Sequence, residues 1–216
     1  MPDFVAQRLN MVDAQVRTNN VIDTRIHAAL VEIPRERFVP AAQRALAYAD
    51  VSVEVAPRRY LLEPRVFAKM VQLAEIKSTD KILDVGTATG YSAAILGKLG
   101  RSVIALEQDA DLVRAAQDLL RGLSNVTLVQ GSLIEGSKPN APFNVILING
   151  AVESVPESLT SQLAEGGRLV AVVQSDNGPG KAHLYVREQG RVAGRPDFDA
   201  QVPALAGFRK AVGFVF

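Results

Sequence analysis

The residues with the clearest potential for chemistry lie in a short loop and in one acidic side chain further along the chain. The loop runs from Asp84 to Gly90 after an apolar stretch, so it is predicted to join a buried strand to a helix. Its glycines, Gly86 and Gly90, let the backbone turn tightly and approach a ligand closely. The next apolar run ends in Glu107, whose carboxylate can accept hydrogen bonds from both hydroxyls of a ribose. Together they predict a site for an adenosine-type cofactor at the carboxyl edge of an α/β sheet.

The loop pattern is Asp-x-Gly-x-Ala-x-Gly, with Ala88 in the middle, and it differs from the Gly-x-Gly-x-x-Gly fingerprint of dinucleotide binders. A plain strand-to-helix turn is the alternative for the loop, and a solvated strand end is the alternative for Glu107. Asp84 is expected either to meet a cationic amino group of the ligand or to cap loop amides. The turn after the following apolar run is expected to border the adenine. The predicted cofactor residues are Asp84, Gly86, Thr87, Ala88, Gly90, Glu107, Gln108, Gly131 and Ser132.

The elements that must position these residues follow an alternating pattern. Helical stretches near 90–99 and 110–121 separate several of the apolar runs, which favours parallel strands buried on both faces. Near the C-terminus, residues 183–186 and 211–216 are predicted to form a hairpin-like pair with one antiparallel strand. The expected strands of the main sheet are residues 81–86, 102–107, 126–130, 143–148 and 168–173.

The N-terminal part has a different character. Residues 3 to about 33 have helical spacing, and residues 34–40 are predicted to be an extended connector with a proline at each end. Residues 51–55 could form a short strand, and Pro64 is expected to open a helix as its first residue. We expect residues 1–78 to form a helical and substrate-binding segment, and residues 79–216 to form the cofactor-binding α/β domain, in one compact unit.

Composition narrows the classes of function. The 216 residues are 48% hydrophobic and 22% charged, which is typical of a folded domain, and the formal net charge of +1 disfavours a nucleic-acid partner. The chain has no cysteine, and its two histidines, His27 and His183, are far apart, so no metal site is expected. We also expect no signal peptide and no membrane span, and therefore a cytoplasmic protein.

Beyond the loop, an ordered set of segments resembles the protein-L-isoaspartate O-methyltransferase family. The resemblance extends over nearly the whole chain. It implies a doubly wound, Rossmann-like methyltransferase sheet of seven strands with an N-terminal helical appendage, and S-adenosylmethionine as the cofactor. It also implies the substrate, the β-linked isoaspartyl carboxylate of aged proteins or peptides, and thus a role in protein repair. The matching segments are residues 34–40, 47–50, 84–94, 142–146, 155–159 and 162–170.

The chain departs from the family in the segment that precedes Pro64. Where the family has Gly-Gln-Thr-Ile-Ser-Gln-Pro, residues 58–64 read Arg-Arg-Tyr-Leu-Leu-Glu-Pro. Leu62 therefore stands at the position of the family serine, and Tyr60 at that of the threonine. The middle loop glycine is Ala88, and Ser132-Leu133 replaces the Asp-Gly that follows the third strand.

The reaction that the resemblance implies needs alignment more than acid–base chemistry. A carboxylate is already an anionic nucleophile near neutral pH, so a general base is not required. Leu62 cannot donate the hydrogen bond of the family hydroxyl. Tyr60 could supply a replacement hydroxyl, and Arg58 or Arg59 could bind a carboxylate through two hydrogen bonds. A packed tyrosine and two solvated arginines are the alternative.

Two rival functions remain open at this point. The first is a degenerate family member that binds the cofactor or a partner without methylating isoaspartate, which the altered segment 58–64 suggests. The second is a nicotinamide-dependent oxidoreductase. This rival calls for a third loop glycine and a separate catalytic domain with a proton donor, and the sequence displays neither.

Overall fold

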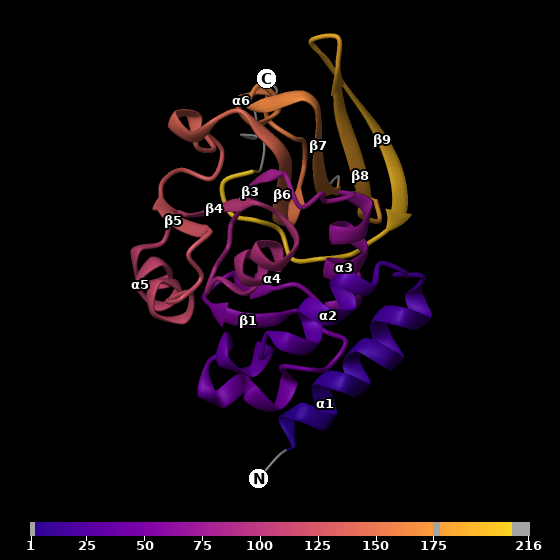
Figure 1. Ribbon diagram of the computed structural model, residues 1–216, viewed down its shortest axis with the longest axis vertical. Helices are drawn as coiled ribbons and strands as arrows, with labels where there is room; N and C mark the ends of the chain where they lie inside the picture. Colours follow the sequence, from indigo (N-terminus) through magenta and orange to yellow (C-terminus); the bar gives the residue numbers. More distant parts are fainter. Residues whose placement is uncertain (1–2, 175–177, 209–216) are drawn as a thin grey trace, which may run out of the picture.

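The computed structural model describes residues 3–174 and 178–208, and a sheet of seven strands forms its centre (Figure 1). The strand order is β5-β4-β3-β6-β7-β8-β9, and β3 to β7 are mutually parallel. Strand β8 is antiparallel to both of its neighbours, so it is the one reversed strand among those described, as the sequence predicted. The strands are β3 (Lys81–Val85), β4 (Ser102–Glu107), β5 (Val126–Gln130), β6 (Phe143–Val152), β7 (Leu163–Val173), β8 (Lys181–Glu188) and β9 (Arg191–Asp199).

The two faces of this sheet are buried in two separate hydrophobic clusters, because successive side chains of a strand point to opposite faces. Ile82 faces the cluster that the N-terminal helices, α4 and α5 complete, whereas Leu83 faces the cluster formed with Leu205 and Phe208. Burial on both faces explains why these strands are continuous apolar runs in the sequence. The helices are α1 (Phe4–Met11), α2 (Thr24–Glu32), α3 (Pro64–Leu73), α4 (Tyr91–Leu99), α5 (Ala110–Leu119) and α6 (Glu157–Thr160).

The N-terminal region is helical but interrupted. Helix α1 continues through a π-helical turn, Val12–Val16, and a 3₁₀ turn, Arg17–Asn19, and it stops where Asn20 takes a left-handed φ of 61°. Helix α2 then ends before Pro34, as predicted. The expectation that residues 34–40 are extended is wrong in part, since Arg35–Arg37 form a 3₁₀ turn between the two prolines. A second 3₁₀ segment, Ala41–Leu46, follows.

A small antiparallel hairpin lies beside the main sheet and was only half predicted. Strand β1 (Val53–Ala56) overlaps the predicted strand at residues 51–55, but its partner β2 (Arg59–Leu61) was not expected. Arg58 in the turn between them has a φ of 61°, a conformation that usually favours glycine. Helix α3 begins at Pro64, as predicted. The hairpin matters because it carries Arg59 to the carboxyl end of β4.

The C-terminal part pairs differently from the expectation. Strand β8 contains the predicted residues 183–186, but its hairpin partner is β9, and the expected partner 211–216 lies outside the described residues. After β9 the chain crosses the carboxyl end of the sheet, shown in yellow in Figure 1. There the amide of Leu205 donates to the carbonyl of Ala151 at 2.8 Å, and the amide of Ala151 donates to the carbonyl of Pro203 at 2.9 Å. Gly150 permits this approach, since a Cβ there would lie 2.8 Å from the Cβ of Leu205.

The helices of the described segments are too short or too polar to cross a lipid bilayer.

Candidate functional site

The predicted loop connects β3 to α4 at the carboxyl edge of the sheet. Its backbone takes left-handed conformations at Gly86 (φ 76°), Ala88 (φ 52°) and Gly90 (φ 95°), so the chain reverses within five residues. The amides of Gly86 and Thr87 donate to the carbonyl of Leu106 in the neighbouring strand, at 2.9 and 3.1 Å. The loop is therefore held against β4, and the strand-to-helix turn that the sequence predicted is present.

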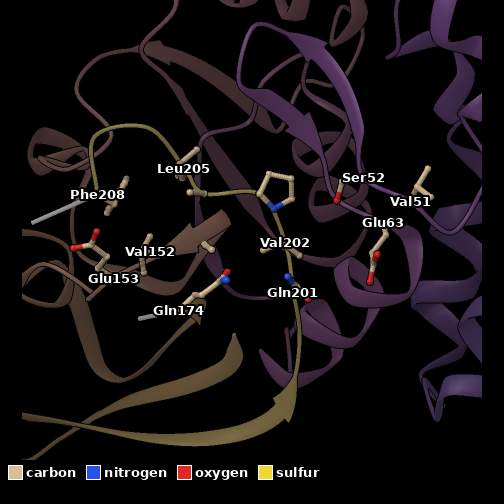
Figure 2. Close-up of a pocket in the computed structure, with 13 residues that line it drawn as sticks. Val51, Ser52, Glu63, Val152, Glu153, Gln174, Gln201, Val202, Leu205 and Phe208 are labelled. Atoms are coloured by element: carbon tan, nitrogen blue, oxygen red, sulfur yellow. The ribbon is translucent and has the colours of Figure 1, made fainter. Parts of the chain in front are cut away.

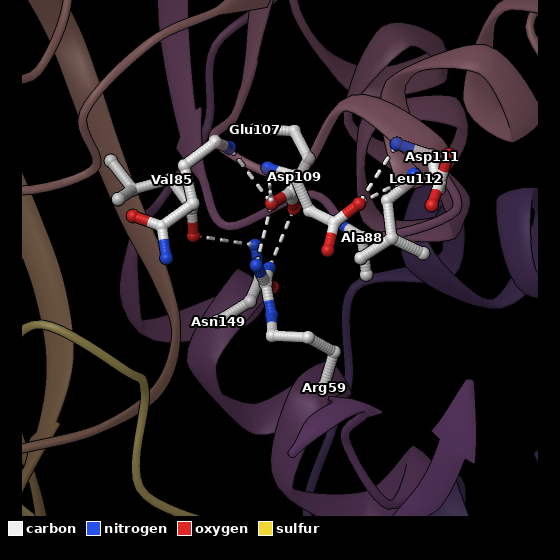
Figure 3. A network of polar contacts seen from close by, with 9 residues as sticks. Arg59, Val85, Ala88, Glu107, Asp109, Asp111, Leu112 and Asn149 are labelled. Carbon is white, nitrogen blue, oxygen red and sulfur yellow. Dashed lines mark hydrogen bonds and ion pairs between the residues drawn. The ribbon is translucent and has the colours of Figure 1, made fainter. Parts of the chain in front are cut away.

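The carboxylate of Glu107 is the centre of the polar network drawn in Figure 3. Its Oε2 accepts a hydrogen bond from the amide of Ala88 at 2.8 Å, and its Oε1 accepts from the amides of Gln108 (2.8 Å) and Asp109 (3.0 Å). The guanidinium of Arg59 binds the same two oxygens, with Nη1 2.5 Å from Oε1 and Nη2 2.6 Å from Oε2. Glu107 is completely buried and Arg59 is 5% exposed.

This ion pair changes the picture drawn from the sequence. We expected Glu107 to face an open hollow where a ribose could bind it, but each of its oxygens is already bonded to Arg59 and to backbone amides. Side chains from distant parts of the chain also lie over the loop. A Cβ at Gly86 would be 3.2 Å from a methyl of Leu205, and one at Gly90 would be 3.0 Å from the side chain of Leu120.

Asp84 is fully buried beneath the loop and is held by neutral donors. The hydroxyl of Ser92 donates to its Oδ2 at 2.6 Å, and the amide of Asn149 donates to its Oδ1 at 2.7 Å. The same amide reaches the carbonyl of Val85 at 3.2 Å. Burial raises the pKa of Asp84 above its ordinary value, while the hydrogen bonds from these side chains act in the opposite direction. Its role here is to brace the end of β3 against α4 and β6.

The remaining predicted cofactor residues gather at the same edge. The amide of Gly131 donates to the carbonyl of Glu107 at 2.9 Å, which brings the turn after β5 next to the acidic residue. The side chains of Gln108 and Ser132 are exposed at this edge. Thr87 is buried, with its hydroxyl 3.5 Å from that of Ser92. The structure thus brings the predicted set together.

The candidate substrate residues are split between two environments. Arg59 is committed to Glu107, whereas Tyr60 and Leu62 line a small enclosed space beside Gly86 and Thr87. Leu62 is buried, and its carbonyl accepts a hydrogen bond from Nη2 of Arg35 at 2.8 Å.

Arg35 is a buried cation that sequence reasoning did not single out. Its Nε donates to the carbonyl of Ala47 at 2.7 Å, and its guanidinium lies over the ring of Tyr91, 4.8 Å from the centroid. Burial lowers the pKa of Arg35, which the neighbouring Tyr91 partly offsets. These contacts tie the motif of residues 34–40 to the start of α4, so Arg35 braces the floor of the site.

A larger cavity of about 640 Å³ opens beside the loop, at the carboxyl end of β6 (Figure 2). It lies between the hairpin region, the end of β6 and the C-terminal segment. Polar side chains of Ser52, Gln174 and Gln201 line it together with the acidic Glu63 and Glu153.

Three residues that shape the site were missed by sequence reasoning, or were given another role. Asn149 ends an apolar run, so its polarity within a buried strand was a usable signal. Arg59 was singled out as a carboxylate binder, but its partner is a carboxylate of the chain itself. Leu205 lies in a segment without periodicity, and nothing local marks it as a neighbour of Gly86.

Comparisons with known proteins agree with this geometry. A model of the family described as protein-L-isoaspartate(D-aspartate) O-methyltransferase matches residues 6–202. The chain is 39% identical over 193 residues to a protein-L-isoaspartate O-methyltransferase of Koribacter versatilis, covering 88% of this chain and 86% of that relative. It is 35% identical over 191 residues to one of Methanoculleus marisnigri, covering 86% and 85%.

Solved structures share the fold. One protein-L-isoaspartate O-methyltransferase superposes with a TM-score of 0.78 at 24% identity, covering 88% of this chain, which spans 63% of that structure's chain. A Plasmodium falciparum protein described as belonging to the same class, in complex with S-adenosyl-L-homocysteine, has a TM-score of 0.79 at 18% identity, with 92% of this chain and 97% of that chain covered. At sequence identities of 24% and 18%, these two structural similarities support the fold alone.

Proposed function

This chain belongs to the protein-L-isoaspartate(D-aspartate) O-methyltransferase family, and on that premise we propose that it methylates isoaspartyl carboxylates of proteins or peptides. S-adenosylmethionine is the methyl donor, and the reaction serves protein repair. The observation that carries the proposal is the placement of the loop and Glu107. The loop amide of Ala88 and the carboxylate of Glu107 meet at the carboxyl ends of adjacent parallel strands, where α/β sheets bind nucleotide-like ligands.

In the arrangement described, the residues of the site do not fit the donor. A ribose would need the two oxygens of Glu107 that Arg59 now binds, and Leu205 lies against Gly86 where the ligand would approach the loop. The loop and Glu107 lie together as the sequence predicted, but side chains of the chain itself occupy the space between them and a ligand. Binding therefore requires that Arg59 and Leu205 move, and we derive no chemical step through the donor.

The acceptor side of the proposal rests on the cavity of Figure 2. An isoaspartyl carboxylate is ionised near neutral pH and is itself the nucleophile, so the chain has to bind and orient it. The cavity adjoins the loop and offers the hydroxyl of Ser52 and the amide groups of Gln174 and Gln201. Glu63 and Glu153 in the same lining would repel a carboxylate, so we place the peptide backbone beside them.

Several expectations from the sequence stay proposals. The cofactor residues from Asp84 to Ser132 are proposed binding residues, and Tyr60 remains a candidate for orienting the acceptor. Residues 1–78 are proposed as the substrate-binding segment of one compact unit. We likewise propose a cytoplasmic location. We propose a protein or peptide as the partner and not a nucleic acid, because the net charge is close to neutral.

Methyl transfer to an isoaspartyl peptide tests the function, with the same peptide containing a normal aspartyl linkage as the control. We expect transfer to the isoaspartyl peptide alone. Leu62→Ser restores a hydroxyl at the family position, and one hydrogen bond to a charged group is worth about 1.5–3 kcal/mol, so kcat/KM should rise about tenfold to a hundredfold. Leu62→Ala removes the leucine without adding a hydroxyl and should produce no such gain. Donor binding without transfer, in both the wild type and Leu62→Ser, would refute the proposed activity.

A further inference from the structure

The disagreement between the framework of the site and its filling points to a specific role for the hairpin β1–β2. We propose that Arg59 competes with the cofactor's ribose for Glu107, so that the donor binds only when the guanidinium has left the carboxylate. Arg59 would then determine cofactor affinity without contacting the reacting atoms. This inference rests on the proposed function, because it takes the family's methyl donor as the ligand.

The geometry of the pair makes the competition direct. A carboxylate offers about four acceptor positions on its two oxygens. In Glu107, Oε1 accepts from Arg59 and from the amides of Gln108 and Asp109, and Oε2 accepts from Arg59 and from the amide of Ala88. The two nitrogens of the fork bind the two oxygens side by side, which is also how the two hydroxyls of a ribose would bind them. Ribose and guanidinium therefore exclude each other.

The carboxylate can remain in place without Arg59. Three backbone amides, those of Ala88, Gln108 and Asp109, still donate to it when the guanidinium leaves. The open state therefore retains a hydrogen-bonded Glu107 that neutral hydroxyls can reach. When a ligand binds only the open state, its apparent Kd equals the intrinsic Kd divided by the fraction of molecules that are open. A more stable pair of Arg59 and Glu107 lowers that fraction and therefore weakens binding.

The strands of the hairpin that carries Arg59 pair with each other and not with the main sheet. Strands β1 and β2 form a two-stranded sheet of their own, with an irregular register between Glu54 and Ala56. Val53 and Leu61 anchor the hairpin in the hydrophobic cluster of the N-terminal helices, so release of Glu107 involves the Arg59 side chain and the adjoining turn and leaves the seven-stranded sheet intact. The turn at Arg58, with its left-handed φ of 61°, is a natural point for that adjustment.

Calorimetric titration of S-adenosylhomocysteine into the wild type, Arg59→Gln and Arg168→Gln tests the inference. Glutamine cannot form the ion pair, and we expect Arg59→Gln to bind at least tenfold more tightly than the wild type. Arg168→Gln is the matched control, because Arg168 forms an ion pair with the buried Asp80 at the opposite end of the sheet, and its Kd should equal that of the wild type.

Arg59→Lys is a second, more conservative variant that tests the inference if Arg59→Gln does not fold. Lysine retains the positive charge beside Glu107 but lacks the two-pronged fork of arginine, so we expect a Kd between those of the wild type and Arg59→Gln. Equal or weaker binding in the Arg59 variants overturns the inference, and so does an absence of binding in all of these proteins. Tight binding by Arg59→Gln without methyl transfer would sustain the inference and refute the proposed function. Transfer by a wild type whose Kd equals that of Arg59→Gln would do the reverse.

Discussion

Two arginine–carboxylate pairs, each with a buried carboxylate, lie at opposite ends of the central sheet, and they differ in what surrounds them. At the amino end, Arg168 of β7 binds Asp80, which immediately precedes β3 and also accepts the amide of Lys77 at 2.8 Å. At the carboxyl end, Arg59 binds Glu107 at the end of β4. Both partners of the first pair belong to the sheet or adjoin it, whereas Arg59 reaches Glu107 from a separate hairpin.

The two pairs have the same chemistry, so their positions in the fold distinguish the role that we propose for each. Ligands of parallel α/β sheets bind at the carboxyl ends of the strands. The pair of Arg168 and Asp80 ties the middle of β7 to the amino end of β3, away from that edge. The pair of Arg59 and Glu107 stands at that edge, where we propose that the donor binds, and Arg59 belongs to a separate two-stranded sheet.

The largest expected effect is on stability, when each arginine is replaced by glutamine. Arg168→Gln leaves Asp80 buried with one backbone donor, so the free energy of unfolding should fall by about 3–5 kcal/mol. Arg59→Gln should lower it by only about 1–3 kcal/mol, because three backbone amides still donate to Glu107. Urea denaturation of both variants and the wild type measures the difference. Equal losses would show that the two pairs are equivalent and would remove the basis of the comparison.

Leu205→Ala probes the second side chain that covers the loop. Leu205 is 4% exposed, and its removal should lower the free energy of unfolding by about 2 kcal/mol, the low end for a buried leucine, because the space opens toward the cavity. The affinity for S-adenosylhomocysteine should rise, since Gly86 becomes accessible. Leu163→Ala, a substitution in the same hydrophobic cluster but at the start of β7, should cost at least as much stability without a gain in affinity. A similar affinity change in both variants would contradict the role of Leu205.

Asp84 differs from the carboxylates of both ion pairs, because it is buried and accepts hydrogen bonds from the neutral side chains of Ser92 and Asn149. Burial raises its pKa in the folded protein above the ordinary value of 3.8. Between these two pKa values the folded state keeps a proton that the unfolded state releases. Stability is therefore highest below pH 3.8 as far as this group is concerned, and it declines as the pH rises through the folded pKa.

Asp84→Asn removes this titration. Urea denaturation at several pH values above 3.8 should show the wild type losing stability relative to the variant as the pH rises. This is the smallest of the expected effects, because the hydrogen bonds from Ser92 and Asn149 favour the ionised form and oppose the effect of burial. Parallel stability curves for the two proteins would show that Asp84 titrates alike in the folded and unfolded states.

The sequence by itself determined the elements and the framework of the site, because both depend on local patterns. Doubly buried strands are apolar runs, Pro64 sets the first turn of α3, and a loop with Gly86 and Gly90 followed by Glu107 marks the ends of two adjacent strands. The family followed from motifs in the same order. Strands β3 to β7 and the reversed β8 lie on predicted runs, and the seven-stranded sheet agrees with what the resemblance implied, but β9 was not predicted.

Only the tertiary structure decided what fills that framework. The ion pair of Arg59 with Glu107 joins residues 48 positions apart, and Leu205 reaches Gly86 from the other end of the chain. The interruption at Asn20 and the 3₁₀ turn at Arg35–Arg37 were likewise decided by packing. Periodicity reports which face of an element is buried, but it does not report which side chain from elsewhere will cover it. A charged side chain is buried only where other groups of the fold satisfy it, as Arg59 does for Glu107 and as neutral donors do for Asp84.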